Sequence, residues 1–175
     1  MPLVLSGTDG ISTNGTSHAL VLDSSGRVRT PFTPAFKAGR SGAYTPGAVE
    51  IIFNQTTGST HFNNGGHYNS SNGRFTAPVA GTYFFTTLII WEQMPNNTSM
   101  DDCMYIYKNG SNITYSFRRA THVSNSTGVG SYYTDFANVV VDLAVNDYVS
   151  VYNAFASRIV HGNSNYTWFA GFLIG

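Results

Sequence analysis

The stretch that decides the fold is Tyr83-Phe84-Phe85-Thr86-Thr87-Leu88-Ile89-Ile90-Trp91, which predicts one long β-strand. Successive side chains of a strand point to opposite faces, so Phe84 and Leu88 lie on one face and Phe85 on the other. Both faces of this strand are therefore apolar. The stretch 168–174 near the C-terminus is apolar throughout in the same way. A sandwich strand with one face in water should carry polar residues there, so we expect a second buried surface, made by other copies of the chain.

The rest of the chain after residue 34 predicts short strands separated by turns rich in Asn, Gly and Ser. Residues 49–53, 104–107, 139–145 and 148–152 are strand-like, and no stretch shows a helical period. The pair Asn109-Gly110 is a strong hairpin signal. About eight to ten strands at this spacing predict an all-β fold, a two-sheet antiparallel jelly-roll sandwich.

Residues 1–34 differ from the rest and predict a separate N-terminal arm. Two short apolar stretches, 19–22 and 27–29, flank Asp23-Ser24-Ser25-Gly26, which indicates a β-hairpin that ends at the prolines beyond it. Such a segment is too short to hold a core alone, so we expect it to anchor the chain to a larger assembly. The predicted anchoring residues are its larger apolar side chains, Leu20, Leu22, Val28 and Phe32. The second predicted domain covers residues 35–175.

Charge is scarce in this chain of 175 residues. Only 10% of residues are charged, against roughly 25% in an average soluble protein, and the formal net charge is zero. A neutral polar surface offers little repulsion between copies and nothing that attracts nucleic acid or anionic lipid.

No apolar run is long enough for a membrane span, so no membrane insertion is expected. The first residues lack the basic region of a secretory signal, which predicts synthesis in the cytoplasm. Cys103 is alone, so no disulfide within the chain is possible, and we interpret it as a small buried side chain.

Motifs for chemistry are missing from the sequence. No serine sits in a nucleophile elbow and no phosphate-binding glycine loop occurs, so we predict that the protein is not an enzyme and needs no cofactor. The histidines lack the spacing of zinc sites, although His61 and His67 could meet in space. Asp101-Asp102 could bind calcium, but two adjacent carboxylates are usually a solvated loop. No metal site is predicted. The five histidines are His18, His61, His67, His122 and His161.

Two surface features leave alternatives open. The pair Arg118-Arg119 follows two aromatic residues and could contact an anionic partner, but charge that protects an edge strand is the favoured interpretation. A group of aromatic residues could form a sugar-binding surface, and packing in the core or between copies explains it equally well. Its members are Tyr132, Tyr133, Tyr152, Tyr166 and Trp168.

One spaced pattern is specific: Asn63, then Tyr68 after four residues, Phe75 after six and Gly81 after five, followed by Tyr83 and Phe85 at alternate positions. This pattern resembles the signature of complement C1q-like globular domains, which belong with the tumour-necrosis-factor-like jelly rolls. The stretches 107–110, 143–149 and 169–173 follow in the order of that family. The resemblance covers roughly residues 35–175 and implies a tight three-fold homotrimer.

The sequence departs from that family at two positions. Thr57 stands where a phenylalanine is usual, and we expect Phe53 to take its role; Thr87 stands where an aromatic residue is usual. Gly81 comes at a strand entrance, and Gly171 inside an apolar strand suggests that a ring or strand packs over it. The predicted core of the fold or the trimer comprises Phe53, Tyr68, Phe75, Gly81, Tyr83, Phe85, Trp91, Gly171 and Phe172.

A second resemblance concerns the arm. Residues 22–28, together with Pro31 and residues 34–36, are similar to the lead-in of such domains in structural proteins of tailed bacteriophages. That resemblance implies a virion protein, made in the host cytoplasm, that contacts other virion proteins through residues 1–34. We expect a trimeric knob on a short fibre or tail appendage that attaches to a host-surface glycan or protein. The alternatives are a capsid decoration protein that stabilises the shell and a bacterial lectin-like adhesin.

Overall fold

A computed structural model describes residues 11–12, 18–22, 24–30, 33–92, 99–100, 104–115, 120–121, 132–154 and 157–175. The chain divides into two compact units, Met1–Thr33 and Pro34–Gly175. Every element in the described residues is a strand, and all strand pairs are antiparallel. The described part of the chain contains no helix long and apolar enough for a membrane crossing.

The first unit is a small three-stranded sheet in the order β1 (Ile11–Ser12), β2 (His18–Leu22) and β3 (Val28–Arg29). The β2–β3 hairpin turns through Gly26, whose φ of 75° is the left-handed conformation that glycine adopts without strain. Leu20 and Leu22 lie in β2 and Val28 in β3, while Phe32 lies outside the described residues. The anchoring role of these four residues stays a prediction.

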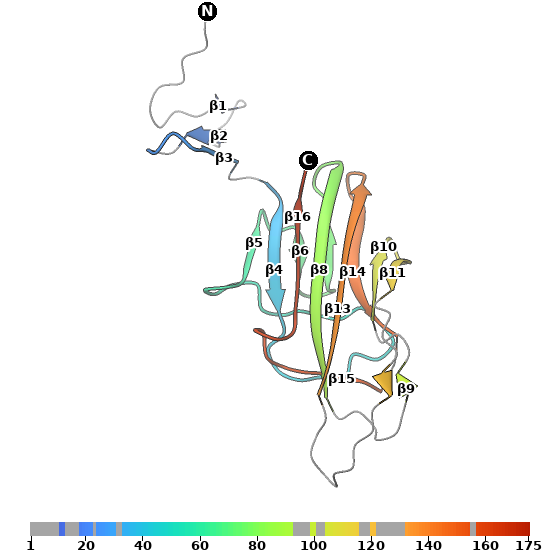
Figure 1. Cartoon of the computed structure of the whole chain (residues 1–175). Coiled ribbons are helices and arrows are strands. Elements are labelled where there is room, and N and C mark those ends of the chain that lie inside the picture. Colours follow the sequence, from blue (N-terminus) through green and yellow to red (C-terminus); the bar gives the residue numbers. More distant parts are fainter. Residues whose placement is uncertain are drawn as a thin grey trace, which may run out of the picture. The chain divides into compact units, whose positions relative to one another are not determined.

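The second unit is a sandwich of two sheets, shown one behind the other in Figure 1. The sheet that we call the β8 sheet has the order β13 (Tyr133–Leu143), β8 (Gly81–Glu92), β16 (Trp168–Leu173), β4 (Ala35–Gly39) and β5 (Phe62–Asn64), and β15 (Ile159–Val160) pairs with the end of β8. The β14 sheet has the order β11 (Ser111–Tyr115), β10 (Met104–Lys108), β14 (Tyr148–Asn153), β7 (Arg74–Thr76) and β6 (Tyr68–Asn69). A short ribbon pairs β9 (Ser99–Met100) with β12 (Ala120–Thr121). The predicted all-β, two-sheet antiparallel jelly roll is confirmed.

Aromatic rings fill the space between the two sheets. The ring of Phe36 lies at the centre, 4.9 Å from Tyr68, 5.2 Å from Phe75 and 5.0 Å from Phe169, measured between ring centroids. The sequence placed Phe36 only within the lead-in stretch 34–36 and did not mark it as a core residue. The predicted aromatic core residues that the structure places in this buried core are Phe53, Tyr68, Phe75, Tyr83, Phe85 and Trp91.

Phe172, predicted in the core of the fold or of the trimer, does not lie in the sandwich core, and its place in a trimer core stays a prediction. Its side chain is 47% exposed, while its neighbour Gly171 is buried. Side chains alternate along β16, so an inward Gly171 forces Phe172 onto the outer side. A run that is apolar at every position hides this alternation, which is why the sequence did not separate the two residues.

Gly171 and Gly81, both predicted core positions, lie where atoms of other residues come close to the backbone. A Cβ at Gly171 would lie 2.4 Å from Cδ1 of Phe85 and 3.0 Å from Cε1 of Phe36, so rings pack directly over this glycine. A Cβ at Gly81, the first residue of β8, would lie 2.8 Å from Cδ1 of Leu173 and 2.9 Å from the backbone oxygen of Gly175. The end of the chain therefore runs against the start of β8.

The two departures from the C1q-like pattern have local explanations. Phe53 is fully buried, and its backbone N–H donates to the hydroxyl of Tyr68 at 3.1 Å. Burial raises the pKa of that Tyr68 hydroxyl. Thr87 is buried as well, and its hydroxyl donates to the backbone oxygen of Trp168 at 2.9 Å. A hydrogen bond between neighbouring strands thus stands where the family usually has an aromatic contact.

Candidate functional site: an apolar sheet face

The outer side of the β8 sheet carries side chains that a single sandwich leaves in water. Along β8, Phe85 and Trp91 are buried, and the residues at alternate positions on the opposite side, such as Phe84 and Leu88, are only partly buried. Along β13, Ala137 is buried while the outward residues are exposed. The alternation read from the sequence of β8 is confirmed: one set of side chains enters the core and the other forms the outer surface.

Strand pairing gathers these outward side chains into rows. Phe84 pairs with Val140 of β13 on one side and with Phe172 of β16 on the other. The rings of Phe84 and Phe172 are 5.5 Å apart. One step further along the strands, Leu88 pairs with Phe136 and with Trp168. We call this surface the apolar face; it comprises Phe84, Leu88, Phe136, Val140, Trp168 and Phe172.

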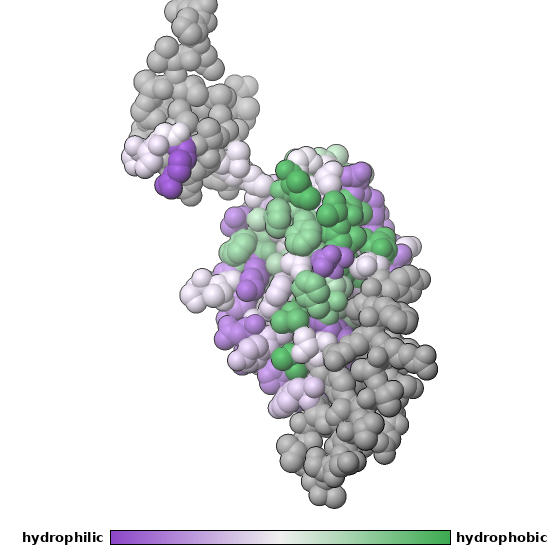
Figure 2. Space-filling model, in the orientation of Figure 1, coloured by the Kyte–Doolittle hydropathy of each residue, from purple (hydrophilic) through white to green (hydrophobic). Residues whose placement is uncertain are grey.

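A short polar row separates the two apolar rows. Thr86 lies between them and pairs with Asn138 on β13 and with Ala170 on β16. The ammonium of Lys37, on β4, lies 5.1 Å from the ring centroid of Trp168, a cation–π contact. Figure 2, in the orientation of Figure 1, shows hydrophobic side chains gathered over the β8 sheet with smaller polar areas among them.

Exposure makes this face unusual. Val140 is 59% exposed, and Phe136 and Phe172 are exposed as well. Adjoining exposed Phe and Val side chains on one sheet are typical of a surface that contacts another molecule, because water meets them at a cost in free energy. The sequence marked neither Phe136 nor Val140 as a site residue, although both occupy alternate, outward positions of β13.

Polar side chains hold the far end of β8 in place. The indole N–H of buried Trp91 donates to the carboxylate of Asp135 at 2.6 Å, which joins β8 to β13 beneath the surface. Glu92, the next residue, contacts Nδ1 of His161 at 2.5 Å, beside the ring of Tyr132. The first contact supports the register of β8 against β13, on which the rows of the apolar face depend, and the second ties the end of β8 to the residue that follows β15.

A hydrogen-bonded turn joins the two sheets at the other end. Asn146 and Asp147 connect β13 to β14, and Asn146 has a φ of 71°. Hydrogen bonds from Asn109, from the backbone of Ala144 and from Lys108 lower the pKa of Asp147 to about 2. The predicted hairpin at Asn109-Gly110 is present, and both of its residues have positive φ.

The other candidate residues do not assemble into one site. Tyr152 lies on the outer side of the β14 sheet and Trp168 on the apolar face, so the aromatic residues proposed as one sugar-binding group are dispersed. Tyr166 is exposed in the turn before β16, and Tyr132 precedes β13. The candidates outside the described residues are Asp101, Asp102, Cys103, Arg118, Arg119, His122 and the side chain of Tyr133.

The two histidines considered as a pair have separate surroundings. His61 is buried, with Nδ1 3.2 Å from the hydroxyl of Thr60 and Nε2 3.1 Å from the backbone oxygen of Ser164. The ring of His67 packs instead on Phe75 at 6.4 Å. Within the part of the chain that the structure describes, no three His, Cys, Asp or Glu residues are grouped closely enough to hold a metal ion.

Comparison with known proteins places this geometry in a family. The family model for the C1q domain matches residues 35–174. Among solved structures, the globular domain of zebrafish complement 1qA protein is similar, with a TM-score of 0.55, 18% sequence identity and coverage of 82% of this chain and 98% of that one. No curated protein matches the sequence. Because the family model spans most of the chain, and the sandwich has the same fold as the zebrafish domain, this chain belongs to the C1q domain family.

Proposed function

We propose that residues 34–175 form a homotrimer with the apolar face of each copy at the interface. We further propose that the trimer is a structural protein of a bacteriophage virion, which attaches the particle to the host surface. The observation that carries the assembly is the apolar face itself. Full burial of one Phe, Leu or Val side chain contributes about 1.5–3 kcal/mol, so partial burial of several at once favours association.

Other copies of the chain suit this face better than a charged partner. The two apolar rows contain no ionised side chain, and Lys37 at their edge already rests on Trp168. The formal net charge of the chain is zero, so copies meet without strong repulsion. C1q-like domains are often trimeric globular modules, and three identical faces around one axis form a closed assembly.

The virion setting is supported by the lead-in to the sandwich. Residues 22–28 and 34–36 resemble the segment that precedes such domains in tailed-bacteriophage structural proteins. The chain also divides between Thr33 and Pro34 into a small sheet and a large sandwich. In this proposal the small unit, with Leu20, Leu22, Val28 and Phe32, binds other virion proteins, and the trimeric sandwich contacts the host.

Two exposed valines give a matched test of the interface. Val140 is 59% exposed on the apolar face, and Val145 is 53% exposed in the turn beyond it. The wild-type chain should sediment as a trimer at micromolar concentration. Val140→Asp should make it a monomer, because a carboxylate buried without a partner costs several kcal/mol. Val145→Asp should leave the trimer intact.

Sedimentation velocity measures the assembly, and circular dichroism checks that both variants are folded. A monomeric wild-type chain would refute the trimer. A trimer that survives Val140→Asp in a folded protein would show that another surface holds it together.

The attachment role needs its own experiment. Purified trimer should bind host cells and compete with the virus for adsorption, and antibodies should locate the chain on a tail or fibre of the particle. Binding to virions without binding to cells would favour capsid decoration. Cell binding by a protein that is missing from purified particles would favour the bacterial adhesin.

A further inference from the structure

The outer side of the β14 sheet carries tyrosines. In β14, Val149 and Val151 are buried in the core, so Tyr148 and Tyr152 point to the opposite side. In β10, Ile106 is in the core, and the residues on either side of it point outward in the same way. We call this surface the tyrosine face; it comprises Tyr105, Tyr107, Tyr148 and Tyr152, with Glu50 and Arg74 at its edge.

Three of the tyrosine rings form a continuous stack. Tyr107 and Tyr152 are parallel within 6°, with centroids 4.5 Å apart, and Tyr105 follows Tyr107 at 6.1 Å and 23°. All three side chains are partly exposed. The hydroxyl of Tyr152 donates to the backbone oxygen of Ala48 at 2.7 Å, which holds one end of the stack in position.

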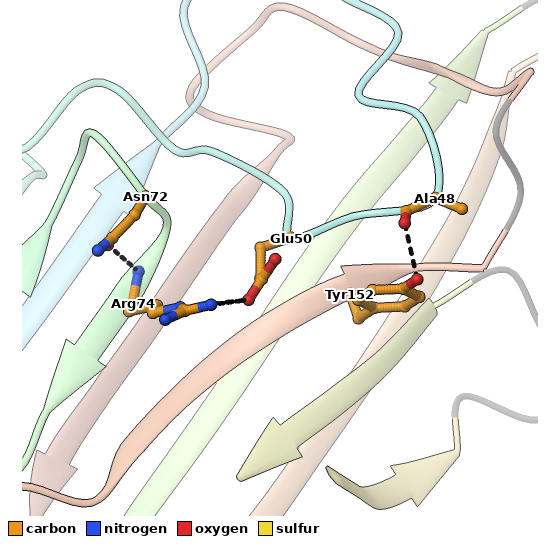
Figure 3. Close-up of polar contacts among 5 residues, drawn as sticks. All are labelled: Ala48, Glu50, Asn72, Arg74 and Tyr152. Carbon is orange, nitrogen blue, oxygen red and sulfur yellow. Dashed lines mark hydrogen bonds and ion pairs between the residues drawn. The ribbon is translucent and has the colours of Figure 1, made fainter. Parts of the chain in front are cut away.

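An ion pair lies beside this stack, and Figure 3 shows it together with Tyr152, the one ring of the stack that is drawn. Arg74 donates from Nη2 and Nε to the same oxygen of Glu50, Oε1, at 2.6 and 3.2 Å. The backbone bridge between Glu50 and Tyr152, and the pairing of Arg74 with Ser150, place both charged residues beside the tyrosines. The guanidinium also lies 4.3 Å from the ring centroid of Tyr148.

The Glu50–Arg74 pair carries no net charge, and both side chains are still partly exposed to solvent. Its side chains are 36% exposed for Arg74 and 24% for Glu50. Partial burial raises the pKa of Glu50, but the hydrogen bond and charge of Arg74 outweigh it and hold that pKa below its usual value. The hydrogen bond to Glu50 raises the pKa of Arg74 in turn. A charged ligand would have to compete with this pair, whereas neutral hydroxyls can both donate to the carboxylate and accept from the guanidinium.

A buried hydroxyl lies in the same outward row. Ser150 pairs with Tyr107 on one side and with Arg74 on the other, on the side of β14 that bears the tyrosines. Its Oγ is buried and has no hydrogen-bond partner among the described residues. An unsatisfied buried hydroxyl costs about 1–3 kcal/mol, and because Ser150 is fully covered, a ligand on this surface would contact the side chains above it and not its Oγ.

We propose that the tyrosine face is a binding site for a neutral saccharide. Partly exposed tyrosine rings and a self-neutralised carboxylate–guanidinium pair match a ligand with alternating C–H patches and hydroxyl groups. The site lies on the opposite side of the sandwich from the apolar face. The proposal specifies the class of ligand that the protein would bind on the host surface, and its biological setting rests on the proposed attachment function. Three copies per trimer would strengthen weak single-site binding.

The probes are three neutral trisaccharides, maltotriose, cellotriose and triacetylchitotriose, with sialyllactose as the charged counterpart. Saturation-transfer NMR on the full-length wild-type protein should detect at least one of the neutral probes, and titration should show weaker binding of sialyllactose. Tyr107→Ala should weaken the neutral probe at least about tenfold, which corresponds to 1.4 kcal/mol. Tyr166→Ala is the matched control and should change nothing, because Tyr166 is exposed but lies in the turn before β16.

A second variant keeps the test valid if Tyr107→Ala disturbs the sheet. Tyr107→Phe retains the stacked ring and removes only the hydroxyl, and it should weaken binding by a smaller factor. No binding of any neutral probe by a folded trimer that still adsorbs to cells would overturn the saccharide site and leave the proposed function standing. Equal loss in Tyr166→Ala, or adsorption abolished by protease treatment of the cells but not by periodate oxidation of their glycans, would overturn it too.

Discussion

The apolar face and the tyrosine face are the two outer sides of one sandwich, and they differ in chemistry. On the β8 sheet the outward rows are Phe, Leu and Val side chains, such as Phe84 and Val140. On the β14 sheet they are tyrosines with the Glu50–Arg74 pair. Phenol hydroxyls and ion pairs keep favourable contacts with water, while phenylalanine rings do not. One sandwich can therefore present one side to its own copies and the other to solvent and its solutes.

The difference does not come from the core, which the two sheets share. Phe85 of the β8 sheet packs on Phe75 of the β14 sheet at 5.4 Å, and Phe36 contacts both. The inner residues of both sheets are mostly apolar, and the buried polar exceptions are Thr87 and Asp135 in the β8 sheet and Asn153 in the β14 sheet. Only the outward set distinguishes the two sheets, so substitutions that separate inner from outer positions test the comparison most directly.

The largest expected effect comes from the inner side of the β8 sheet. Phe85→Ala should lower the free energy of unfolding by about 3–5 kcal/mol per chain, because it leaves a cavity at the centre of the core. Phe172→Ala, on the apolar face, should cost less than about 1 kcal/mol in a monomeric chain, where its side chain is 47% exposed.

Urea unfolding of both variants in the Val140→Asp background measures this difference without a contribution from assembly. Equal losses for Phe85→Ala and Phe172→Ala would show that the outer side of β16 is covered within a single chain. The distinction between core and apolar face would then fail.

A smaller effect tests how the apolar face depends on the packing beneath it. Gly171→Ala should destabilise the chain by about 1–3 kcal/mol, because the new Cβ would lie 2.4 Å from the ring of Phe85. The strand must shift outward to relieve this contact and carries Phe172 with it, so the trimer should also dissociate more readily. Denaturant unfolding and sedimentation measure the two effects. A variant as stable as the wild-type chain would show that the β8 sheet yields easily, and the apolar face would not depend on a rigid core.

The smallest effect concerns the turn that joins the two sheets. Hydrogen bonds hold the pKa of Asp147 at about 2, below its unfolded value of 3.8, so the carboxylate stabilises the folded chain above pH 4. That contribution should disappear as the pH falls toward 2. Asp147→Asn should therefore lower the melting temperature slightly at pH 7, and the difference from the wild-type chain should vanish near pH 2. A difference that stays constant from pH 7 to pH 2 would exclude the charge of Asp147 as its cause.

Local sequence patterns determined much of this protein. The alternation in 83–91 assigned Phe85 to one side and Phe84 to the other, and the structure has the same division. Asn109-Gly110 predicted a hairpin because Asn and Gly adopt positive φ at little cost. The spaced pattern from Asn63 to Phe85 identified the fold, since each residue type there meets a local demand of a strand, a turn or a close approach.

Only the tertiary structure decided which side chains meet. Phe84 lies between Val140 and Phe172 through strand pairing across more than fifty residues, and Glu50 meets Arg74 because a loop and β7 run along the same edge of β14. The sequence could not decide whether Phe172 lies in the core of the fold or on the outer side, because a fully apolar strand carries no sign of which face is inner. Alternation along a strand is a property of the local backbone, whereas register between strands follows from the packing of the whole core.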